Sequence, residues 1–70
     1  MNTTDLGTQN LYRALLAHFL YAGSGNVDSR ISHQLVNNTF ALQAQHGISD
    51  TAYMALADQA QAAADAELDS

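Results

Sequence analysis

Apolar positions along this 70-residue chain recur with the period of an α-helix, and four glycines divide the chain into three segments. The first segment, 8–22, repeats its large side chains at spacings of three and four, which predicts an amphipathic helix. These apolar residues are Leu11, Tyr12, Leu15, Leu16, Phe19 and Leu20. They cover about half of the helix circumference, which is more than one neighbouring helix needs. Thr8 is a suitable N-cap, and the stretch from Gly23 to Asn26 ends the helix.

The second segment predicts a helix that begins at Asp28 or Ser29, because either side chain can cap its first turn. We expect this helix to end at His46. Gly47 then supplies the left-handed residue that commonly follows a helix, which allows Ile48 to fold back onto the last turn.

This second helix carries two separate apolar rows. Ile31, Leu35 and Leu42 lie within about 40° of one another, whereas the side chains of Val36 and Phe40 point about 100–180° away. We expect one row to face the chain's own core. The other row then needs a second surface to bury it.

The third segment predicts a helix that starts at Ser49, with Ile48 and Tyr53 as a hydrophobic staple and Asp50 at the positive end of the dipole. Its inward row comprises Tyr53, Leu56, Ala57, Ala60, Ala64 and Leu68. Acidic residues near the C-terminus oppose the helix dipole, so we expect 66–70 to fray. At the other end of the chain we expect 1–7 to be disordered. The prediction is one all-α domain over 1–70, either a helical hairpin or a three-helix unit.

Charge narrows the classes of partner. The chain has two arginines, no lysine and seven carboxylates, for a net charge of −5. Nucleic-acid and anionic membrane surfaces are bound mainly through Lys and Arg, so both are disfavoured. The most apolar stretch, 11–22, is too short to span a bilayer. The first seven residues lack the basic start of a secretory signal, which favours a cytoplasmic location.

Candidate chemistry is sparse. Without cysteine there are no disulfides or thiolate metal sites, and the three histidines are scattered. Ser32 and His33 would point about 100° apart on a helix, so they cannot act as nucleophile and base. The glycine-containing loop at 23–26 lacks the strand and lysine of a phosphate-binding loop. We therefore expect no enzymatic activity, no cofactor and no metal.

The turn at 46–49 has the outline of a helix-turn-helix, which would make the chain a small repressor. Its recognition helix would carry Asp50, Asp58 and Asp65 and no cation, so it would repel phosphates. An acidic nucleic-acid mimic, such as an anti-restriction or anti-CRISPR inhibitor, is a further alternative. Such a mimic would lose its affinity at moderate ionic strength, unlike an inhibitor anchored by apolar contacts.

Protein binding fits the surface pattern better. Uncharged amides and an arginine around an aliphatic anchor are typical of protein–protein interfaces. The expected partner-binding residues are Arg30, Asn38, Leu42, Gln45 and His46. A chain this short has a marginal core and often needs a second subunit, so we also expect a homodimer. The expected dimer interface comprises Leu11, Leu15, Phe19, Ile31, Leu35, Val36 and Phe40.

Two stretches, Asp-Ser-Arg-Ile-Ser-His at 28–33 and His-Gly-Ile-Ser-Asp at 46–50, carry a family resemblance. Together with the length and acidity, they resemble the small quorum-sensing anti-activator proteins of temperate Pseudomonas phages. The resemblance covers about 28–50, which is less than half of the chain. It implies a dimeric helical protein that binds a LuxR-family (LasR-type) transcription activator and blocks its DNA binding. It also implies a second target, the type IV pilus assembly ATPase.

Overall fold

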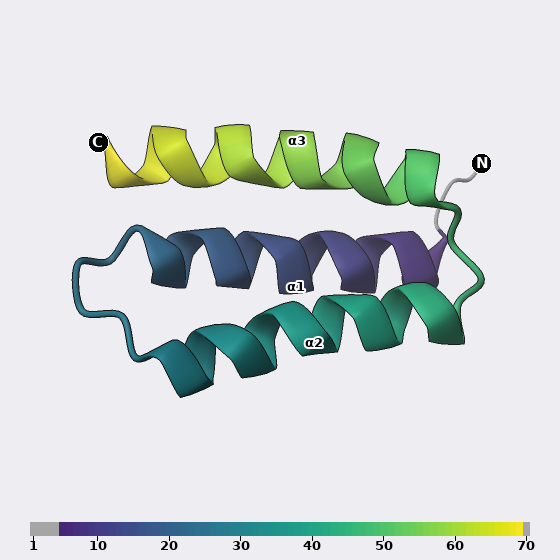
Figure 1. Ribbon diagram of the computed structural model, residues 1–70. Coiled ribbons are helices and arrows are strands. Elements are labelled where there is room, and N and C mark those ends of the chain that lie inside the picture. Colours follow the sequence, from purple (N-terminus) through teal and green to yellow (C-terminus); the bar gives the residue numbers. More distant parts are fainter. Residues whose placement is uncertain (1–4, 70) are drawn as a thin grey trace.

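The computed structural model describes residues 5–69, which form the helices α1 (Leu6–Ala22), α2 (Ser29–Gln45) and α3 (Asp50–Leu68). No strand occurs in this part of the chain, so the all-α prediction is confirmed, and of the two expected architectures the structure has the three-helix unit. α1 lies between the other two helices and packs against both of them (Figure 1). The described chain measures 36 × 27 × 17 Å. This flattened shape leaves much of each outer helix without a neighbour.

α1 begins two residues before the expected cap, because Asp5 rather than Thr8 caps it. The Asp5 carboxylate accepts hydrogen bonds from the Gly7 backbone N–H at 3.0 Å and from the Thr8 hydroxyl at 2.7 Å. The bond from the Thr8 hydroxyl is the largest cause that holds the pKa of Asp5 below its ordinary value. Residues 5–7, which we expected to be disordered, therefore form the cap and first turn, while 1–4 lie outside the described residues.

The start and end of α2 follow the prediction closely. Asp28 caps the helix by accepting a 2.8 Å hydrogen bond from the Arg30 backbone N–H. At the other end Gly47 has a φ of +64°, the left-handed conformation that favours glycine. The N–H of Ile48 donates to the Gln43 carbonyl at 3.0 Å, which closes the helix in the manner expected of a left-handed terminal glycine.

α3 is capped by Ser49, whose hydroxyl accepts a 3.1 Å hydrogen bond from the Ala52 backbone N–H. The helix continues to Leu68, so residues 66–68 are helical where we expected fraying. Leu68 lies over Gly23 at the end of α1, where a Cβ on the glycine would collide with the leucine side chain. The last turn of α3 therefore lies close to the end of α1, although Leu68 is still 44% exposed. Residue 70 lies outside the described residues.

The core lies between α1 and α3. Leu11 is 0% exposed and Leu15 is 2% exposed, and they form a buried cluster with Ala60 of α3, on which Ala64 is also fully buried. The part-buried side chains around this centre are Tyr12, Leu16, Phe19, Leu42, Ile48, Tyr53, Leu56 and Ala57. Small alanines on the inward row let α3 lie close to α1. The predicted inward position of Ala60 and Ala64 is confirmed.

Candidate binding surface

α2 buries a single residue completely, and that residue is Thr39. The Thr39 hydroxyl donates to the Val36 carbonyl at 2.7 Å and lies 2.8 Å from the Tyr53 hydroxyl of α3. A buried polar side chain with its hydrogen bonds satisfied is stable in a core. Thr39 therefore marks the centre of the inward face of α2.

The two apolar rows of α2 flank this inward strip. At about 100° per residue, Leu35 lies about 40° to one side of Thr39 and Val36 about 60° to the other. Farther round, Ile31 is 45% exposed and Phe40 is 51% exposed. We expected one row to be buried and the other free, but the structure leaves both rows incompletely covered. The reason is that the helix turns the strip between the rows toward α1.

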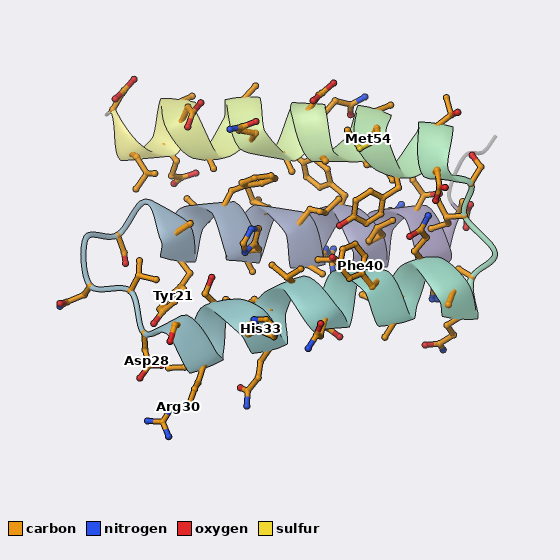
Figure 2. The ribbon with its side chains drawn as sticks, viewed as in Figure 1. Tyr21, Asp28, Arg30, His33, Phe40 and Met54 are labelled. Atoms are coloured by element: carbon orange, nitrogen blue, oxygen red, sulfur yellow. The ribbon has the colours of Figure 1, made fainter. Side chains whose placement is uncertain are left out.

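Phe40 is held in place at the end of α2 that lies near α3 (Figure 2). Its ring stacks on Tyr53 with a centroid separation of 5.7 Å and an interplanar angle of 26°. Beside this pair, the Gln43 amide donates a 2.7 Å hydrogen bond to the Asp50 carboxylate. Phe40 is thus oriented by its neighbours while half of its surface stays open to solvent.

The other end of α2 is attached to α1 through Tyr21. The Tyr21 hydroxyl accepts a 2.7 Å hydrogen bond from the Asp28 backbone N–H (Figure 2). Arg30 lies 3.8 Å from the Asp28 carboxylate, but its side chain is 90% exposed. Such an exposed ion pair stabilises a fold little and leaves the guanidinium open to other partners. Val27 and Ile31, both about half exposed, flank this end of the helix.

Two of the five expected partner-binding residues make contacts within the chain. Arg30, Asn38 and Gln45 are exposed, and they share an arc of about 80° on α2. Leu42 instead packs against the core cluster. His46 is also exposed, but its side chain lies so close to Gly7 that a Cβ on the glycine would come within 2.7–2.9 Å of three of its atoms. The structure thus gives Leu42 and His46 contacts within the chain.

The expected dimer interface is corrected in part. Leu11 and Leu15 belong to the chain's own core, so in this fold they are not available to a second subunit. Phe19 is half-buried and packs against the same cluster. The physical reason is that α3 covers the inward side of α1. Of the expected interface, α2 still offers Ile31, Leu35, Val36 and Phe40.

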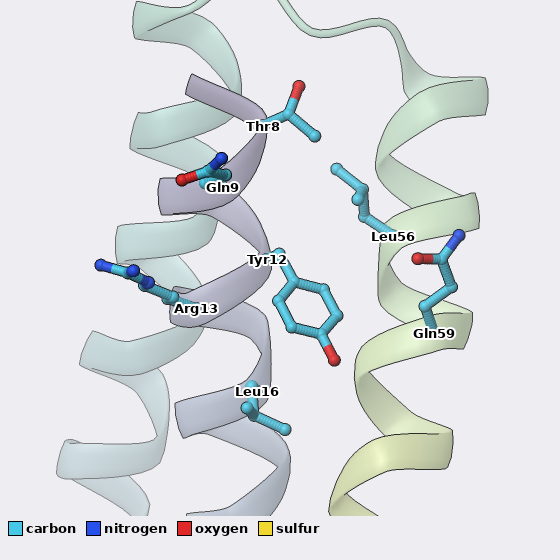
Figure 3. Close-up of a pocket in the computed structure, with 7 residues that line it drawn as sticks. All are labelled: Thr8, Gln9, Tyr12, Arg13, Leu16, Leu56 and Gln59. Carbon is cyan, nitrogen blue, oxygen red and sulfur yellow. The ribbon is translucent and has the colours of Figure 1, made fainter. Parts of the chain in front are cut away.

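A surface that the sequence did not indicate lies between α1 and α3 (Figure 3). It is an open groove of about 510 Å³. The residues that line it are Thr8, Gln9, Tyr12, Arg13, Leu16, Leu56 and Gln59. The width of the apolar stripe on the first segment was the only signal for it, since that stripe exceeds what one neighbour covers.

Neither a metal centre nor a membrane helix is found in residues 5–69. No group of three or more His, Asp or Glu side chains there is placed to hold a metal ion. None of the three helices in that range has the length and apolar character needed to cross a membrane. Comparisons with protein-family models, curated proteins and solved structures find no match to this chain.

Proposed function

We propose that the protein acts by binding another polypeptide through α2 and that this binding inhibits the partner. The observation that carries the proposal is the exposure of Ile31 and Phe40, each about half open on either side of Thr39. Burying a side chain of this size fully is worth about 1.5–3 kcal/mol. In a chain of this length that is a large share of the total stability, so a covering partner supplies a substantial gain.

The proposed partner contact is the Ile31 surface, which we define as Arg30, Ile31, Leu35, Asn38 and Gln45. It combines an exposed aliphatic anchor with an arginine and two amides. Interfaces commonly concentrate their binding energy in such an anchor within a polar rim. Leu35 is half-buried and lies one helical turn from Ile31, so it adds a second aliphatic side chain to this surface.

The partner that we propose is a LuxR-family transcription activator of the LasR type. The support is the sequence resemblance at 28–33, which contributes Arg30 and Ile31 to the Ile31 surface. The net charge of −5 suits a basic, DNA-binding surface, because complementary charge speeds encounter and fixes orientation. A chain docked there would exclude DNA. The type IV pilus assembly ATPase is the second proposed target, on the same resemblance.

A gel-shift assay with purified LasR-type activator and its operator DNA tests this function. Wild-type protein is expected to release the DNA, and Ile31→Asp to need a concentration about 30-fold higher or more, since an unpaired charge would be buried at an anchor. Leu6→Asp is the matched control, because Leu6 is 69% exposed on α1 and outside the Ile31 surface. Circular dichroism checks that both variants fold.

Two results of that assay would contradict the proposal. One is that wild-type protein leaves the activator bound to DNA at all concentrations. The other is that Ile31→Asp and Leu6→Asp inhibit equally well. Raising the ionic strength serves as a second readout, because contacts through an apolar anchor survive salt that screens exposed charges.

We further propose that two copies of the chain associate through the second row of α2. Phe40 supports this, because it is half exposed yet oriented by its stacking on Tyr53. Sedimentation equilibrium at micromolar concentration is expected to give twice the 7.5 kDa mass of one chain. Phe40→Ala is expected to give single chains, and the similarly exposed Val27→Ala to stay paired. A wild-type mass of 7.5 kDa would rule out the dimer.

A further inference from the structure

The α1–α3 groove has an apolar floor that no helix of the described chain covers. Tyr12 and Leu16 of α1 and Leu56 of α3 form this floor, and all three are half-buried. The polar residues that line it are Thr8, Gln9, Arg13 and Gln59, and the Arg13 side chain extends from the rim away from α3 (Figure 3). None of these residues belongs to the Ile31 surface, so the groove is a separate site.

Charge singles out the kind of ligand that suits the groove. Arg13 is exposed, and within residues 5–69 its guanidinium has neither an ion pair nor a hydrogen bond. The other arginine of the sequence, Arg30, already lies beside Asp28. None of the seven carboxylates is among the lining residues, but the Asp5 carboxylate lies at one end of the groove, where it accepts a 2.7 Å hydrogen bond from the Thr8 hydroxyl. Arg13 is therefore the one cation that lines this apolar groove, and it has no carboxylate partner within residues 5–69.

The dimensions of the groove match a short helix. Thr8, Tyr12 and Leu16 follow one another at four-residue intervals on α1, so this wall extends about 12 Å, or about two helical turns. Leu56 and Gln59 of α3 form the opposite wall. An apolar floor between two helices is a common receptor for the apolar face of a third helix.

We propose that the α1–α3 groove is a second docking site, which receives an acidic amphipathic helix of a partner protein. The helix places its apolar row on Tyr12, Leu16 and Leu56. A carboxylate flanking that row pairs with the guanidinium of Arg13, which can accept it in a two-pronged geometry. This inference does not depend on the proposed function of α2, because the two sites share no residue.

The test uses the whole chain, labelled with ¹⁵N, and a synthetic alanine-based helical peptide with two leucines four residues apart and one flanking glutamate. Addition of the peptide is expected to shift the backbone amide signals of Gln9, Arg13 and Gln59. Arg13→Glu is expected to weaken binding of this peptide about tenfold, since attraction becomes repulsion. A second peptide, with lysine in place of glutamate, should bind Arg13→Glu more tightly than wild type.

Arg30→Glu is the matched control, because it makes the same change of charge on α2 and should leave peptide affinity within about twofold of wild type. The proposal is overturned if the peptide shifts no groove signals at millimolar concentration. It is also overturned if both arginine variants weaken binding equally, because net charge alone then explains the effect. If the groove signals shift with protein concentration before any peptide is added, the groove binds a second copy of this chain. That result would also overturn the proposal.

Discussion

Replacing Leu11 with alanine is expected to lower the free energy of unfolding by about 2–5 kcal/mol. Leu11 is 0% exposed and lies at the centre of the cluster with Leu15 and Ala60. The shorter side chain would leave a cavity in this cluster, and Ala60 on the facing helix is too small to fill it. A single small core rarely supplies more than about 3–5 kcal/mol, so most of the variant should be unfolded at 37 °C.

Urea denaturation followed by circular dichroism measures this effect. The control is Leu6→Ala, which removes the same atoms from the same helix at a position that is 69% exposed. Its unfolding free energy should stay within about 0.5 kcal/mol of wild type. Both variants are compared at one protein concentration, because self-association would make the midpoint depend on concentration. Equal midpoints for the two variants would place Leu11 outside the core.

Enlarging Ala60 is the second substitution expected to have a large effect. Ala60→Leu adds three carbons at a position that is 0% exposed, where α3 lies against α1. The added volume has to push the two helices apart or force strained rotamers, which lowers the free energy of unfolding by about 1–3 kcal/mol. The better helix propensity of alanine over leucine is a minor term by comparison.

Ala62→Leu provides the control for this substitution, because Ala62 is exposed on the same helix and receives the same added side chain. Thermal unfolding should place Ala62→Leu close to wild type and Ala60→Leu at a clearly lower midpoint. If instead both variants melt at the wild-type temperature, α3 does not pack on α1 through its alanine row.

Both ends of α2 and the start of α3 were predictable because their causes are local. Asp28, Gly47 and Ser49 act on backbone groups one to three residues away, and the structure confirms each of them. The start of α1 was harder to locate, because Asp5 and Thr8 are both good caps. Asp5 caps the helix because its carboxylate accepts both the Gly7 N–H and the Thr8 hydroxyl, a choice that residue preferences alone do not determine.

The inward face of α2 was not predictable from its apolar pattern. Thr39 is polar, so the apolar pattern does not place it in the core. The Tyr53 hydroxyl that hydrogen-bonds with the Thr39 hydroxyl comes from another helix. The apolar rows on either side therefore looked like one core row and one free row. Likewise, the pattern predicts that Leu11 and Leu15 are buried. It does not predict that Ala60 of α3 is the residue that forms the buried cluster with them.

The groove depends on tertiary structure in the same way. Tyr12 and Leu16 were visible as part of an unusually wide apolar stripe, but Leu56 and Gln59 join them only when α3 lies beside α1. Sequence periodicity shows that surplus apolar surface exists. It does not show where on the folded chain that surface forms a floor, nor that Arg13 stands beside it.

The central claim is that α2 presents an apolar surface that a partner protein covers. The chain has only two isoleucines, Ile31 on the proposed surface and Ile48, which packs against the core cluster. The experiment uses deuterated protein with labelled isoleucine methyl groups, bound to an unlabelled LasR-type activator. Saturation of the activator's protons should lower the intensity of the Ile31 methyl signal and leave the intensity of the Ile48 signal unchanged. If the Ile31 signal keeps its full intensity while the activator is saturated, the claim is contradicted.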